Sequence, residues 1–277
     1  MNKDKHYDLV VCIRCHKEPA FICDTYDSVV KNTNPERTKV ICAVDNNIKL
    51  TEQLKQSLGE DVIYNSPHPN GWGAGLFTLY LEAIEWAESK WSFSHFCSID
   101  YDTLFLDKGA DDALLSRVTD ETIGLVGDYV VSHQHWATVF RKEKEKFEKV
   151  FGPVPKKYVE GEGVQGGCLM ITRRGIDLFK EKGIFNPPYR NAKDNTNIAD
   201  DHLLPIFIRM CGLGIMTAVP FTDCKWVATR DPKGLEKKGV KIFHPTKMRP
   251  KSKNRQREID IRNYFRKIRC VPLLGKV

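Results

Sequence analysis

The chain has 277 residues, of which 41% are hydrophobic and 29% charged, which is typical of a globular protein and excludes a disordered one. No apolar run approaches the about 20 residues of a membrane-spanning helix, and the N-terminus is polar, so we expect a cytoplasmic protein without a secretory signal. Nine cysteines, several within apolar runs, are typical of reduced core cysteines and not of a disulfide framework.

The net charge of +7 belongs to the C-terminal end of the chain. Residues 247–277 contain eleven Lys and Arg and two acidic residues, a charge of +9, whereas the remaining 32 basic and 34 acidic residues give −2. This asymmetry predicts a domain over residues 1–246 followed by a basic tail over 247–277.

The first hundred residues alternate between two hydrophobic patterns. Short apolar, β-branched runs predict buried strands at residues 7–13, 39–44, 61–64 and 93–99. Apolar residues at helical spacing predict helices from Pro19, over 51–58 and after the glycine-rich turn 70–75. This alternation predicts an α/β fold, a mostly parallel sheet covered by helices, which binds ligands at the carboxyl ends of its strands.

The second half of the chain is less regular. Strands are predicted at residues 128–131, 167–172, 214–219 and 241–244. Helices are predicted at residues 141–150, 200–210 and 254–269, the last within the basic tail.

Asp100 and Asp102 carry the strongest chemical signal. They directly follow a predicted buried strand, so two hard oxygen ligands lie at its carboxyl end. Such a pair suits Mg²⁺ or Mn²⁺ held against a diphosphate. The alternative is an ordinary polar turn, which also favours aspartate.

Other strand ends offer further candidates, each with a structural alternative. Asp45 suits hydrogen bonds to a ribose or base, or an Asx turn. Gly166 and Gly167, before a predicted strand, allow the close approach of a substrate, or form a tight turn. His244 is a candidate metal or phosphate ligand, although a lone histidine is more often structural.

Two further pairs of polar residues each allow a functional and a structural interpretation. Asp200 and Asp201 begin a predicted helix, where they act either as caps or as a general base for an acceptor. His133 and His135 have the spacing of two residues on one face of a strand, which suits metal binding, polar surface or acceptor contact.

Taken in order over residues 7–246, these segments resemble the GT-A fold glycosyltransferases, particularly the large family 2 type. The resemblance implies a Rossmann-like GT-A fold with the Asp-x-Asp motif at Asp100-Tyr101-Asp102. It also implies a set of donor-binding residues: Cys15, His16, Asp45, Asn46, Gly73, Asp100, Tyr101, Gly166 and Gly167.

The resemblance further implies an activity: metal-dependent transfer of one hexosyl or pentosyl group from a nucleoside-diphosphate sugar, foremost a UDP-sugar, to an acceptor hydroxyl. Asp100 and Asp102 would hold Mn²⁺ or Mg²⁺, with His244 as a third ligand. The family's Glu-Asp pair is Asp-Asp here, so Asp201 by position, or Asp200, would be the base. In-line attack inverts the sugar, although the same fold also serves retention. The family's Gln-x-x-Arg-Trp motif is absent, which indicates a non-processive enzyme.

The basic tail leaves the acceptor open. It either packs on the domain with a solvated charged face, or binds an anionic acceptor or partner such as modified DNA, an acidic glycan or a lipid surface. Two rival functions are a nucleotidyltransferase, although residues 14–18 lack its glycine-rich loop, and a non-enzymatic basic nucleic-acid-binding protein, which would leave the strand-end aspartates unexplained.

Overall fold

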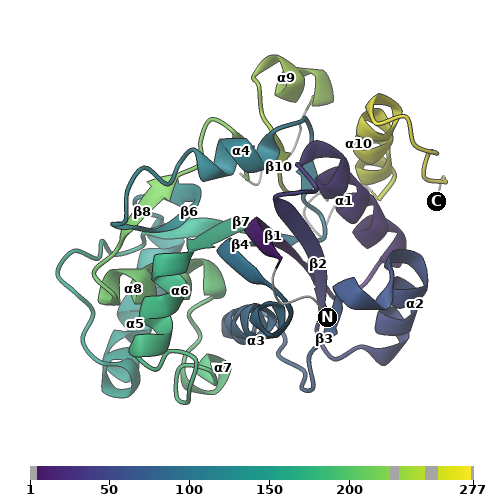
Figure 1. Ribbon diagram of the computed structural model, residues 1–277. Helices are drawn as coiled ribbons and strands as arrows, with labels where there is room; N and C mark the ends of the chain where they lie inside the picture. The colour runs from purple at the N-terminus through teal and green to yellow at the C-terminus, as the bar shows by residue number, and fades with distance from the viewer. Residues whose placement is uncertain (1–4, 225–230, 247–254, 276–277) are drawn as a thin grey trace.

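A seven-stranded sheet forms the centre of the molecule in the computed structural model, which describes residues 5–224, 231–246 and 255–275. Its strand order is β3-β2-β1-β4-β7-β6-β8 (Figure 1). β7 runs antiparallel to β4 and β6, and the other neighbouring pairs are parallel. The strand bounds are β1 His6–Cys15, β2 Thr38–Val44, β3 Ile63–Asn65, β4 Ser92–Asp100, β6 Ile123–Val130, β7 Gly163–Thr172 and β8 Gly214–Thr217.

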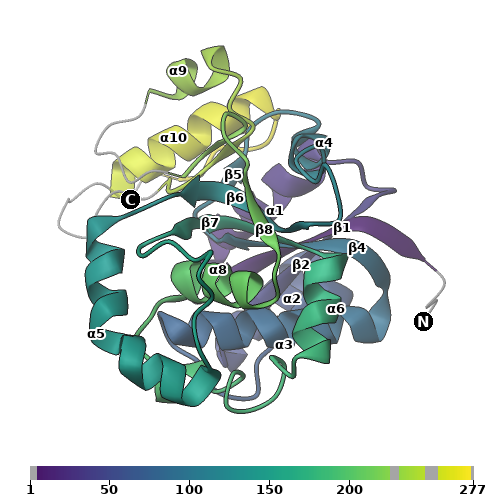
Figure 2. The same ribbon diagram turned by 90° about the vertical axis from the view of Figure 1, so that its left-hand side faces the viewer.

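Helices cover both faces of this sheet (Figures 1 and 2). Side chains alternate along β1, so Leu9, Val11 and Ile13 enter one core while Val10 and Cys12 enter the other. The first core packs against α1 Pro19–Asn32, α2 Ile48–Leu58 and α4 Ala110–Leu115. The second packs against α3 Ala74–Lys90, α5 Gln134–Phe151, α6 Arg173–Glu181 and α8 Asp200–Met210. The predicted α/β fold with a mostly parallel, helix-covered sheet is confirmed.

A small three-stranded sheet lies on the α1 side of the central sheet. It has the order β5-β10-β9, with bounds β5 Leu104–Phe105, β9 Thr222–Asp223 and β10 Ile242–Phe243. Two further helices, α9 Pro232–Lys237 and α10 Arg255–Ile268, pack on it through an apolar cluster that includes Leu104, Phe243, Ile261 and Phe265. Short helices η1 Glu60–Val62 and α7 Ala192–Asn195 complete the elements of the described residues. None of the helices that the structure describes could span a membrane.

Several predicted bounds differ from the observed ones. α5 begins at Gln134 and not at residue 141, because Ala137, Phe140 and Phe147 share its buried face at helical spacing. The predicted strand pair His133 and His135 is therefore wrong: His133 is the N-cap of α5, and His135 lies in its first turn. β7 begins at Gly163 and not at residue 167, so Gly166 and Gly167 lie in the middle of the strand and not ahead of it or at its start. α8 has the predicted bounds.

Candidate metal and nucleotide site

The turn after β4 brings two carboxylates and an imidazole together. Asp100 ends β4, and the backbone N–H of Thr103 donates to its carbonyl at 3.0 Å, which closes the turn. We call residues 100–103 the metal turn. His244 follows β10, and its Nε2 lies 3.3 Å from Asp100 Oδ2 and 3.5 Å from Asp102 Oδ1. The small sheet therefore carries His244 to the carboxyl end of β4.

This group can hold a divalent cation. Each of the three residues offers a ligand atom, and these atoms lie within 4.8 Å of one another. Carboxylate oxygens and a neutral imidazole suit Mn²⁺ or Mg²⁺. Burial by itself lowers the pKa of His244, but Asp102 and Asp100 raise it to about 9, which shows how strongly this buried place favours positive charge. The donor set thus fits the divalent ion that the sequence predicts.

Gly167 provides the space for the imidazole. A Cβ atom at this position would lie only 2.1 Å from Cγ of His244, so no side chain larger than hydrogen fits without moving the ring. The Gly167 carbonyl accepts a hydrogen bond from the Thr103 hydroxyl at 3.0 Å, which ties β7 to the metal turn. The group that approaches this glycine closely is therefore a side chain of the same protein.

Arg14 of β1 is a site residue that the sequence patterns did not reveal. It is buried, its Nη2 lies 2.9 Å from Asp100 Oδ1, and its Nη1 pairs with Asp200. Nη2 also donates to the Gly166 carbonyl at 2.5 Å. Burial acts to raise the pKa of Asp100, but Arg14 and then His244 outweigh it and hold this pKa below its usual value. Arg14 thereby keeps Asp100 ionised and joins it to α8.

A pocket adjoins Asp100 at the carboxyl ends of β1 and β2. It contains three more of the predicted donor-binding residues, together with Arg14 and residues of the glycine-rich turn. The full lining is Arg14, Cys15, His16, Asp45, Gly71, Trp72, Leu76, Leu79 and Asp100. The pocket thus joins the predicted nucleotide residues to the metal turn.

Aromatic rings form one side of this pocket. The His16 ring makes edge-to-face contacts with Trp72 and Tyr101, at centroid distances of 4.8 and 4.6 Å. Trp72 is 66% exposed although it is large and apolar, and glycines flank it on both sides. An exposed aromatic ring beside a pocket is suited to stacking on a planar ligand. Trp72 was not among the predicted donor-binding residues. Its position between two glycines is the sequence feature that could have indicated it.

Asp45 has a structural task in the same region. Its two carboxylate oxygens accept hydrogen bonds from the backbone N–H groups of Asn70 and Gly71, at 2.7 and 2.9 Å. It therefore holds the glycine-rich turn against β2. Asn46, with a φ of 46°, and Gly73, which caps α3, do not line the pocket.

The first residues of α8 lie on the other side of Arg14. Asp200 pairs with Arg14, whereas the Asp201 carboxyl is partly exposed. Burial, and then the neighbouring Asp200, raise the pKa of Asp201 to about 8. The next residue, His202, is buried against Trp136, with ring centroids 3.9 Å apart. α8 thus presents a carboxyl of raised basicity beside a partly exposed tryptophan.

No protein-family model matches the sequence, and no curated protein matches it either. Among solved structures, the chain is similar to the mannosyltransferase PcManGT from Pyrobaculum calidifontis, in complex with GDP-Man and Mn²⁺. The TM-score is 0.50, with 14% identity over 98% of this chain and 67% of that chain. The fold is that of the GT-A glycosyltransferases.

Two further matches have lower TM-scores. Mouse xyloside xylosyltransferase 1 gives 0.47, with 10% identity over 86% of this chain and 97% of that chain. An active-site mutant of LgtC gives 0.47, with 14% identity over 91% of this chain and 94% of that chain. At identities this low, the chemistry of the site must be argued from this chain's own residues.

We predict that Gly167→Ala weakens Mn²⁺ binding roughly tenfold, because the added methyl group displaces the His244 ring. It should also cost about 1–3 kcal/mol of stability through overpacking. Gly214→Ala is the control, since its Cβ would meet only ordinary contacts, the nearest at 3.4 Å. Mn²⁺ titration of the purified variants measures the first effect and thermal unfolding the second; equal Mn²⁺ affinity in the two variants would contradict the assignment of His244.

Proposed function

We propose that this protein is a metal-dependent glycosyltransferase that transfers one sugar from a nucleoside-diphosphate sugar to an acceptor hydroxyl. The observation that carries the proposal is the group Asp100, Asp102 and His244 at the edge of the pocket lined by His16 and Trp72. The GT-A fold supports it, as does the solved neighbour that holds GDP-Man and Mn²⁺. The sequence resemblance favours a UDP-sugar, so both uridine and guanosine donors belong in a test.

The residues of the metal turn would bind the donor diphosphate through the ion. Asp100, Asp102 and His244 are the ligands, and Mn²⁺ or Mg²⁺, when bound, neutralises charge on the leaving diphosphate. Arg14 keeps Asp100 ionised and fixes its orientation by a contact of 2.9 Å. The aromatic pair His16 and Trp72 is placed to contact the nucleoside.

Asp201 is the general base in this proposal. Asp200 is engaged by Arg14, which leaves the neighbouring, partly exposed carboxylate to accept the acceptor's proton. A pKa of about 8 suits a base that works near neutral pH. A single base on the acceptor side fits direct in-line displacement, so we propose inversion of the anomeric centre.

The nucleotidyltransferase alternative fits this site less well. Such an enzyme needs, after its first strand, a loop rich in glycine and basic residues that holds a triphosphate. Here Arg14 is committed to Asp100 and Asp200, and Glu18 rather than glycine has the left-handed φ of 59°. The residues after β1 therefore offer no cradle for a triphosphate.

Asp102→Asn should lower the rates of Mn²⁺-dependent hydrolysis and transfer by roughly 10²-fold or more, because it removes a negative charge from the buried ion site. The assay incubates the protein with UDP- and GDP-sugars and measures released nucleoside diphosphate with Mn²⁺ and with chelator. Asp107→Asn removes an exposed carboxylate nearby and should keep full activity. Wild-type protein that hydrolyses no nucleotide sugar, or an active Asp102→Asn variant, would overturn the proposed function.

Asp201→Asn should lower transfer by roughly 10²–10⁴-fold and yet raise the melting temperature. The pKa of this carboxyl is about 4 in the unfolded chain and is raised to about 8 in the folded protein. It therefore destabilises the fold increasingly as the pH rises from about 4 to about 8. The stability gained by the variant should therefore be larger at pH ~9 than at pH ~4. Asp194→Asn, at an exposed position of α7, is the control for both readouts. A gain in stability that does not change with pH would refute the raised pKa.

A further inference from the structure

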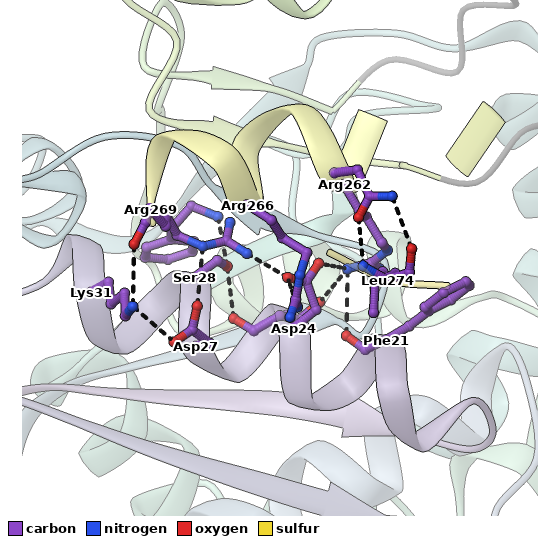
Figure 3. Close-up of polar contacts among 12 residues, drawn as sticks. Phe21, Asp24, Asp27, Ser28, Lys31, Arg262, Arg266, Arg269 and Leu274 are labelled. Atoms are coloured by element: carbon purple, nitrogen blue, oxygen red, sulfur yellow. Dashed lines mark hydrogen bonds and ion pairs between the residues drawn. The ribbon is translucent and has the colours of Figure 1, made fainter. Parts of the chain in front are cut away.

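A buried cluster of charges joins α10 to α1. Asp24 of α1 is almost inaccessible to solvent and forms ion pairs with three arginines. Arg262 and Arg266 belong to α10, and Arg269 directly follows it. Arg262 Nη1 and Arg266 Nη1 each lie 2.8 Å from its oxygens, and Arg269 also pairs with it (Figure 3). The tail is thus anchored to the domain by ion pairs as well as by apolar packing.

Arg262 also reaches the metal turn. Its side chain is fully buried, and its Nη2 donates to the carbonyl oxygen of Tyr101 at 3.0 Å. Its Nε lies 3.2 Å from Glu258, one turn earlier on α10. Arg262 therefore spans from Asp24 to the residue that separates Asp100 from Asp102.

Thr25, next to Asp24 on α1, supports the same turn. Its hydroxyl lies 2.6 Å from the Tyr101 carbonyl and 3.0 Å from the Thr103 carbonyl, so its single proton serves both acceptors. Arg262 Nη1 lies 3.4 Å from the Thr25 hydroxyl oxygen and fixes its orientation. Two helices from opposite ends of the chain thus meet at one carbonyl group.

Asp102 of the metal turn is held by Thr246, which is in turn bonded to Glu258 of α10. The backbone N–H of Thr246 donates to the Asp102 carbonyl at 2.8 Å. The Thr246 hydroxyl lies 3.0 Å from both that carbonyl and Glu258 Oε1. Every carbonyl from Tyr101 to Thr103 therefore has a donor that belongs to α1 or is linked to α10.

Stability alone is a poor explanation for these buried charges. Desolvating an arginine and its carboxylate partners commonly costs as much as their attraction returns. What the charges do supply is several fixed donors aimed at the backbone of one short turn. Ligands of a metal need placement to within about 0.5 Å, which such supporting hydrogen bonds provide.

We propose that Arg262 is a positioning residue through which α10 fixes the metal turn, so that the tail is part of the metal-binding unit. This inference rests on the proposed function. It also assigns a use to the tail's charge: Arg262, Arg266 and Arg269 face Asp24 and Asp27, and the guanidinium groups of this face are directed inward and not toward an anionic acceptor. Residues 247–254 of the tail lie outside the described residues.

The test compares two arginines that share one partner. Arg262→Met removes the donor to the metal turn, whereas Arg266→Met loses an ion pair of the same length to Asp24 but no contact with the turn. We expect Arg262→Met to weaken the binding of Mn²⁺ to protein without nucleotide sugar at least fivefold. Arg266→Met should change this affinity less than twofold. The free Mn²⁺ signal in electron paramagnetic resonance measures both dissociation constants, and circular dichroism checks folding.

Thr25→Val provides a second variant with no change of charge. It should weaken Mn²⁺ binding in the same direction, whereas Thr51→Val, which removes a buried helix hydroxyl on α2, should not. If Arg262→Met does not fold, this pair decides the question. Folded Arg262→Met or Thr25→Val with the affinity of its control would overturn the inference and leave the proposed function intact. Wild-type protein that binds no Mn²⁺ would instead overturn the metal site itself.

Discussion

The convergence of carboxylates at the end of β4 is the constraint on which the rest of the site depends. Asp100 and Asp102 lie in one short turn, and Asp200 approaches them from α8, all largely removed from solvent. Their mutual repulsion must be balanced by positive charge, because water cannot screen it there. Arg14 from β1 provides part of that charge. His244, which follows β10, provides the rest while it is protonated, and a bound divalent ion would take the place of its proton.

The sequence predicted the parts of this site that lie within single segments. Asp100 and Asp102 were visible because an apolar strand leads directly into them, and α8 was visible from its periodicity and its ending glycine. Arg14 was not predicted, because the pattern around a basic residue in an apolar strand does not indicate its partner. That partner, Asp200, lies 186 residues away in the sequence. Contacts between distant segments are settled by the fold, and local patterns do not encode them.

The glycine pair and the tail show where a correct local observation supported an incomplete explanation. Gly167 does permit a close approach, but the approaching group is His244. The tail does contain an amphipathic helix, yet Arg262, Arg266 and Arg269 lie against an acidic residue of α1 and not on a solvated face. A net charge does not show which charges are paired, so a segment of charge +9 can still place three of its eleven basic residues against Asp24 and Asp27.

Support for the metal turn comes from both ends of the chain. Arg14, near the N-terminus, orients the Asp100 carboxylate, while Arg262, near the C-terminus, holds the carbonyl of the next residue. Side chain and backbone of the turn are therefore fixed from different elements, and neither arginine can replace the other. An ion site that is set in this way requires the whole fold to be assembled, which explains why a turn of four residues can be placed with the accuracy that metal ligands need.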